Sequence, residues 1–170
     1  MRRVRPGSPG WNMSSSSDAG TGPMTSPTAI HAMVDRCRAT DLPAAVTRLR
    51  SGWVVLGERQ VLAGYCLLLP DPVVPHLNAL PPDSRRQFLS DMSRVGDALL
   101  EVTAALRINY AIFGNAEPAL HAHIFPRQAG EPATLRTVHP WALDWNAAPH
   151  YSDAIHGDLK QRLAAALAAA

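Results

Sequence analysis

The sequence predicts an α+β domain in which an antiparallel sheet is crossed by one long helix and flanked by short helices near the two ends of the chain. Two pairs of short apolar segments, each pair divided by a turn, indicate β-hairpins. Between the pairs lies a long segment whose apolar residues recur every three or four positions, as on one face of a helix. A chain of 170 residues is long enough to bury one core, so we expect a single domain.

Residues 1–27 differ in composition from the rest of the chain. They are rich in serine, glycine and proline, and residues 14–17 are all serine. Such a segment lacks the apolar side chains that offset chain entropy on folding. We therefore predict a disordered N-terminal extension over 1–27 and one folded domain over 28–170.

The first half of the domain is expected to contain a helix and the first hairpin. Residues 28–39 space their apolar side chains as a helix does, and a second helical turn is expected at Leu42-Pro43, since proline suits the first helical position. Residues 53–56 and 65–69 are strongly apolar and are divided by turn residues. They should pair as an antiparallel hairpin at the centre of the sheet.

The long helix should follow a proline-rich loop over 71–82, with Asp83-Ser84 as its cap. Its apolar face is predicted to pack in the core and has no functional role: Phe88, Met92, Val95, Leu99, Val102 and Leu106.

A second hairpin follows, from the apolar run 110–113 through a turn at Gly114 to a second apolar run closed by Pro126. The chain then becomes irregular, and Trp141 and Trp145 are expected to cover one end of the sheet, with contact to a nucleotide as the alternative. The alanine-rich tail, from about Tyr151 to Ala170, should form a helix.

The candidate chemistry lies in the stretch NAEPALHAHIFPR, residues 115–127. Because strand side chains alternate between faces, His121, His123 and Phe125 should share one face, and the apolar residues between them should share the other. The two imidazoles would then sit about 6.5–7 Å apart at the backbone. That spacing suits a phosphate held between them, or a metal ion.

A metal site at these histidines would need a third ligand. His76, His139 and Glu117 are candidates, but no spacing in the sequence specifies one, so we expect no bound metal. Cys37 and Cys66 lack zinc-type spacing and are predicted to be free thiols. His31, His150 and His156 are expected at the surface.

Composition argues against several function classes. The three arginines and one aspartate of residues 1–27 account for the whole formal charge of +2, and Lys160 is the only lysine. A neutral body argues against a nucleic-acid surface, which needs clustered basic residues. No apolar stretch of a signal peptide follows the N-terminal arginines, and no run approaches the roughly 20 residues of a membrane span. We expect a cytoplasmic protein with no membrane partner.

The order of these parts resembles the histidine triad superfamily over residues 51 to about 127. The resemblance rests on a GYCLLLP strand, a proline-rich loop, an amphipathic helix, a YAIFGN strand and LHAHIFPR, and it implies a fold like that of the histidine triad (HIT) proteins. The superfamily pattern is His-φ-His-φ-His-φ-φ, where φ is apolar. Aligned on HIFPR, His121 matches the middle histidine and His123 the last, while Ala119 stands in place of the first.

The resemblance implies a covalent mechanism on a nucleotide. His121 would attack an α-phosphate to form a nucleotidyl-histidine, and water or another acceptor would release it. The backbone carbonyl of Ala119 would fix the tautomer of the nucleophile, and His123 would bind phosphate oxygens. Asn115 is expected near the same phosphate or ribose. Arg127 is expected either to contact phosphate or to pair with a surface carboxylate.

The sequence also departs from the superfamily pattern. Residues 116–118 replace a longer Gly- and Gln-containing loop, Tyr65 stands where some hydrolases have a histidine, and Gly57 stands where they have a nucleotide-contacting asparagine. Tyr65 is itself expected to contact the nucleotide. The resemblance implies a homodimer and a nucleotide substrate such as a phosphoanhydride or phosphoramidate. No cofactor would be required, although Mg²⁺ could accompany a polyphosphate. The alternative is a non-catalytic nucleotide-binding module.

Overall fold

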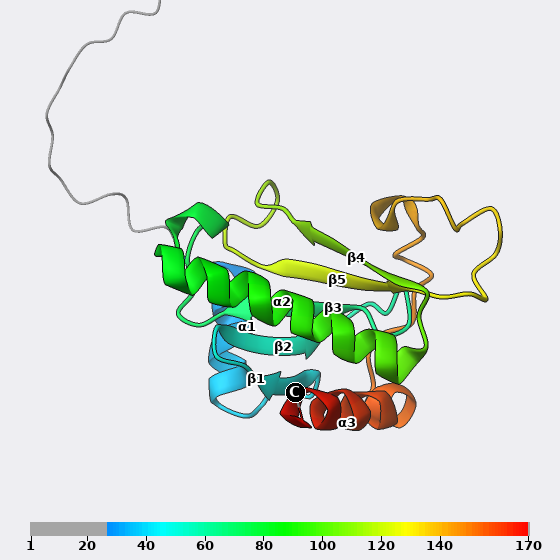
Figure 1. Ribbon diagram of the computed structural model, residues 1–170, viewed down its shortest axis with the longest axis horizontal. Helices are drawn as coiled ribbons and strands as arrows, with labels where there is room; N and C mark the ends of the chain where they lie inside the picture. The colour runs from blue at the N-terminus through cyan, green and yellow to red at the C-terminus, as the bar shows by residue number, and fades with distance from the viewer. Residues whose placement is uncertain (1–26, 170) are drawn as a thin grey trace, which may run out of the picture.

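The computed structural model describes residues 27–169, which form a five-stranded antiparallel sheet and three α-helices (Figure 1). The strand order is β1-β2-β3-β5-β4, and each neighbouring pair is antiparallel. The predicted α+β class is therefore confirmed, whereas the extension predicted for 1–27 lies outside the described residues except for Pro27. The elements are α1 (Ala29–Arg38), β1 (Ala45–Arg48), β2 (Gly52–Leu56), β3 (Cys66–Pro70), α2 (Pro82–Thr103), β4 (Arg107–Ile112), β5 (Ala122–Arg127) and α3 (Asp153–Ala169), with short 3₁₀ turns at Leu77–Ala79 and Pro140–Ala142.

Both predicted hairpins are present. β2 pairs with β3 through the register Val55 to Leu67, and β4 pairs with β5 through the register Tyr110 to Ile124. The buried side chain of Gln60 organises the loop of the first hairpin, because its amide donates to the carbonyl oxygens at both ends of that loop and its own carbonyl accepts from a backbone N–H within it. These hydrogen bonds fix the position of Tyr65, which directly precedes β3, relative to the end of β2.

Helices cover the two faces of the sheet unequally. α2 crosses one face, in front of the sheet in Figure 1, and packs with α3 at the lower edge, whereas α1 lies behind. The core on the α2 face contains Leu120, Ala122 and Ile124, and the core on the α1 face contains Ala119 and Phe125. The alternation predicted for the histidine strand is thus confirmed, and the histidines face away from α2.

Three local predictions were wrong. Pro43 and the next residue form a turn that leads into β1, so the chain pairs with β2 where a helical turn was expected. α2 begins at Pro82 and has no side-chain cap. Asp83 lies inside the first turn, where its negative charge interacts favourably with the helix dipole. The same helix ends at Thr103, and Leu106 lies beyond it with 65% of its surface exposed.

Within residues 27–169, none of the helices combines the length and the apolar character that a membrane span requires.

Candidate histidine site

His121 and His123 lie side by side at the start of β5. Their ring centroids are 4.7 Å apart and the ring planes meet at 71°. His121 directly precedes the strand and is buried, whereas His123 is half-buried within it. The expectation that both imidazoles share one face is confirmed, although they are less exposed than two surface side chains would be.

A backbone carbonyl fixes the proton of His121. Its Nδ1 lies 2.8 Å from the carbonyl oxygen of Ala119, and a carbonyl can only accept, so Nδ1 carries the hydrogen and donates it. In the neutral form of the ring, Nε2 then has a free lone pair. The backbone N–H of Leu120 donates to the carbonyl of Val74 at 2.7 Å, which ties this segment to the loop after β3. Ala119 therefore acts on His121 through its backbone, as expected from its position.

His123 is enclosed by aromatic rings. Phe125 lies parallel to it on the same strand, and Trp141 meets it edge-on with centroids 4.7 Å apart. The hydroxyl oxygen of Tyr65 lies 2.6 Å from Nδ1 of His123. Burial, followed by the neighbouring His121, lowers the pKa of His123 to about 4, so this imidazole is neutral at neutral pH.

The segment after β5 supplies an aromatic wall that sequence reasoning did not place. Trp141 contacts His123, Phe113 and Phe125, and Trp145 contacts Tyr65 and Phe125. The two tryptophans thus cover the histidine face itself, and the expectation that they close one end of the sheet was too coarse.

Of the two roles expected for Arg127, the structure shows pairing with a carboxylate and not a guanidinium free for phosphate. Its guanidinium is buried and donates to both carboxylate oxygens of Glu131 and to the carbonyls of Leu135 and Val138. These partners occupy the fork of donors that would otherwise receive a phosphate. The alternative role, pairing with a carboxylate, is the correct one, and it anchors the segment that carries the tryptophans.

Of the remaining predicted positions, Tyr65 lies at the histidine pair and Asn115 does not. Asn115 is exposed in the loop between β4 and β5, and no hydrogen bond links it to either histidine within residues 27–169. Tyr65 is buried, and its hydroxyl contacts His123. His156 was expected at the surface, but it is buried near the start of α3 and stacks on Tyr151.

Across the described part of the chain, no three histidine, cysteine, aspartate or glutamate side chains gather in a geometry that could hold a metal ion. The third ligand that a metal site would need at His121 and His123 is therefore not supplied by His76, His139 or Glu117 in this arrangement.

A hollow of about 730 Å³ lies on the same face of the sheet as the histidines, although neither histidine lines it. Val55 and Leu67 line it, and Leu67 stands directly opposite His123 in the β3–β5 pairing. Tyr65 borders both the hollow and His123. Other walls come from α1, the first hairpin loop and the C-terminal part of the chain, including Met33, Arg36, Leu42, Glu58, Arg59 and Trp145. The hollow thus combines apolar walls with a charged rim.

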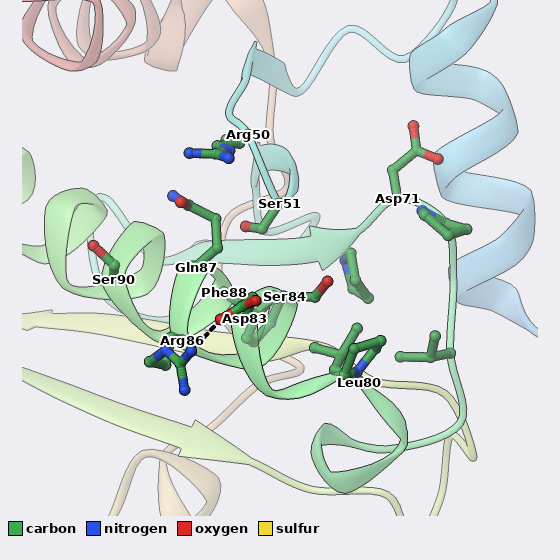
Figure 2. Close-up of a pocket in the computed structure, with 14 residues that line it drawn as sticks. Arg50, Ser51, Asp71, Leu80, Asp83, Ser84, Arg86, Gln87, Phe88 and Ser90 are labelled. Atoms are coloured by element: carbon green, nitrogen blue, oxygen red, sulfur yellow. Dashed lines mark hydrogen bonds and ion pairs between the residues drawn. The ribbon is translucent and has the colours of Figure 1, made fainter.

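A second hollow, of about 700 Å³, lies between the first turns of α2 and the turn that joins β1 to β2 (Figure 2). Its lining contains no histidine. Ser51 is held at its edge by Asp91, whose buried carboxylate accepts hydrogen bonds from the backbone N–H and the hydroxyl of Ser51. This hollow is separate from the histidine pair.

Residues 53–130 match the HIT domain family, and this segment includes β2, β3, α2, β4, β5 and both histidines. The chain therefore carries a histidine triad (HIT) domain over this segment, and its fold is that of solved histidine triad proteins. This domain is divergent, because Ala119 occupies the position of the first triad histidine.

Several solved structures share the fold. A histidine triad protein from Bradyrhizobium japonicum superposes with a TM-score of 0.64 at 24% identity, covering 76% of this chain and 94% of that one. A hypothetical histidine triad nucleotide-binding protein from Sulfolobus tokodaii gives 0.63 at 14% identity, covering 81% and 92%. A zinc-bound histidine triad family protein from Mycobacterium smegmatis gives 0.58 at 21%, covering 81% and 93%. No curated protein matches the chain.

Proposed function

We propose that this HIT-domain protein binds a nucleotide and transfers its nucleotidyl group to water or another acceptor through a covalent intermediate on His121. The observation that carries the proposal is the hydrogen bond from His121 Nδ1 to the carbonyl of Ala119, because in the neutral form of an already oriented ring it leaves the lone pair of Nε2 free. The first triad histidine is not needed for this bond, since any residue at position 119 provides a carbonyl.

The chemistry follows in two steps. Nε2 of His121 attacks the α-phosphorus, an N–P bond forms, and the bond to the leaving group breaks with its electron pair going to that group. Water or another acceptor then attacks the same phosphorus and releases the nucleotide and the neutral imidazole. His123, whose ring is 4.7 Å away, binds an oxygen of the same phosphate and stabilises the charge that develops there.

The hollow beside Tyr65 is the proposed site of the base and ribose. It shares the face of the histidines, and one of its lining residues, Leu67, is paired with His123 on the neighbouring strand. Its apolar walls suit a planar base, and its charged rim suits hydroxyl groups. The name of the Sulfolobus tokodaii structure, a nucleotide-binding protein, agrees with this class of ligand.

A non-catalytic nucleotide-binding module is the second candidate. The observation that favours it is Ala119, which removes one imidazole from the surroundings of the phosphate, together with the short loop over 116–118. Such a protein would keep the hollow and bind nucleotides without forming a covalent adduct.

The experiment is the turnover of a fluorogenic nucleoside phosphoramidate and of a dinucleoside polyphosphate. His121→Ala should leave almost no activity, and His121→Gln should do the same while preserving more of the buried volume. His123→Ala should be slower by roughly a hundred- to a thousandfold, the typical cost of one charge-stabilising contact. His76→Ala, an exposed histidine in the loop after β3, is the matched control.

If both His121 variants remain folded by circular dichroism and keep more than a few per cent of the wild-type rate, the mechanism is wrong. If the wild type binds AMP and turns over neither substrate, the binding module is the better description.

A further inference from the structure

Tyr65 occupies a tightly defined place beside His123. Its ring stacks on Phe125 with centroids 4.5 Å apart and planes within 6°, and Trp145 meets it edge-on at 5.5 Å. These contacts hold the ring so that its hydroxyl ends 2.6 Å from Nδ1 of His123. The packing of the aromatic rings therefore holds the Tyr65 hydroxyl in place beside His123.

Gly57 makes room for this ring. A Cβ atom at position 57 would lie 2.3 Å from both Cδ1 and Cε1 of Tyr65, which is too close for any real contact. The backbone N–H of Gly57 also donates to the carbonyl of Tyr65 at 2.9 Å, so the two residues are fixed against each other. Any side chain at position 57 would displace the tyrosine from His123.

In the hydrogen bond between Tyr65 and His123, the hydroxyl is the donor and the imidazole is the acceptor. Burial raises the pKa of the Tyr65 hydroxyl, so it keeps its proton at neutral pH. A buried hydroxyl needs an acceptor, and within residues 27–169 Nδ1 of His123 is the partner found for it. A neutral imidazole that accepts at Nδ1 must carry its own proton at Nε2.

We propose that Tyr65 is a positioning residue that holds His123 in the Nε2–H tautomer. The carbonyl of Ala119 holds His121 in the opposite, Nδ1–H tautomer. Two adjacent imidazoles thereby present different groups to one phosphate: a lone pair from His121 for attack and an N–H from His123 for an oxygen. This inference deepens the proposed function and rests on it for its catalytic meaning.

The test that does not depend on turnover is the tautomer itself. Long-range ¹H–¹⁵N spectra of the labelled full chain distinguish protonated from unprotonated imidazole nitrogens. In the wild type at neutral pH, we expect His123 to be protonated at Nε2 and unprotonated at Nδ1. Tyr65→Phe keeps the stacked ring and removes only the hydroxyl, so His123 should become a mixture of tautomers.

Gly57→Ala should give the same mixture by pushing the ring away. Tyr110→Phe, which removes a hydroxyl from β4, should leave the spectrum of His123 unchanged. If His123 carries its proton on Nδ1 in the wild type, or keeps a pure Nε2–H form in folded Tyr65→Phe, the inference is overturned.

Turnover gives a second reading. Tyr65→Phe should lower kcat about three- to tenfold with little change in KM, as expected for the loss of one neutral hydrogen bond. An unchanged kcat in an active enzyme would overturn the catalytic part. If the wild type shows no turnover at all, the proposed function fails, and the spectra still decide whether Tyr65 sets the tautomer.

Discussion

Replacing Arg127 by methionine should strongly destabilise the domain. The side chains of Arg127 and Glu131 are only 7% and 9% exposed, and their closest nitrogen–oxygen distance is 2.6 Å. Methionine keeps most of the buried volume but leaves the Glu131 carboxylate without its main cation. Breaking a buried pair on one side typically costs about 3–5 kcal/mol. We expect a loss in that range, because two backbone carbonyls also lose their donor.

The assay is urea unfolding followed by circular dichroism, with a double-mutant cycle through Glu131→Gln. Arg127→Met with Glu131→Gln should recover part of the lost stability, since no charge then remains buried without a partner. The control is Arg162→Met, which breaks an exposed pair with Asp158 at the same i,i+4 spacing and should cost about 1 kcal/mol or less. A loss below about 1 kcal/mol for Arg127→Met, or no coupling in the cycle, would refute the structural role and reopen the phosphate role.

Three further predictions concern pH, metals and assembly. The pKa of His123 falls from an ordinary 6.5 to about 4 in the fold. Between these two pH values the unfolded chain is protonated at His123 and the folded chain is not, so the free energy of unfolding should decrease as the pH falls from 6.5 to about 4. The upper bound on this loss of unfolding free energy is about 3 kcal/mol, which solvent screening reduces. Urea unfolding at neutral pH and at about pH 4 should therefore show a smaller loss of stability in His123→Gln than in wild type. Treatment with a chelator should leave phosphoramidate turnover intact, because the nucleophile is a nitrogen, and zinc-dependent recovery of lost activity would contradict this. Light scattering at micromolar concentration should give the mass of a homodimer, with α2 or the C-terminal segment in the interface, and a monomer would contradict that expectation.

The sequence predicted those parts of the fold that local patterns encode. The helix stripe around Val95 and Leu99 follows from periodicity, and the strand predicted over 65–69 follows from a continuous apolar run between turn residues. The structure has them in α2 and in β3 (Cys66–Pro70). β1 was missed because its four residues, Ala45–Arg48, are too few to show alternation, and the proline before them also suits a helix start. Its strand character comes from pairing with β2, which is a tertiary effect.

The candidate site was predictable only along one strand. The shared face of His121 and His123 follows from a period of two, whereas the role of the Ala119 carbonyl was implied by the resemblance to the HIT superfamily. The partners that refine the chemistry are remote in sequence: Tyr65 lies 58 positions before His123. Trp141 stands in an irregular segment with no periodicity to place it, so no local signal could have assigned either residue to the histidines.

The most direct test of the account is to trap the covalent intermediate. Wild type, His121→Ala and His123→Ala would each be mixed with a nucleoside phosphoramidate, quenched in alkali, which preserves phosphorus–nitrogen bonds, and digested for mass spectrometry. We expect a nucleotidyl adduct on the peptide that contains residue 121 in wild type and His123→Ala, and none in His121→Ala. An adduct that persists in His121→Ala, or wild-type turnover with no adduct at any quench time, would contradict nucleophilic attack by His121.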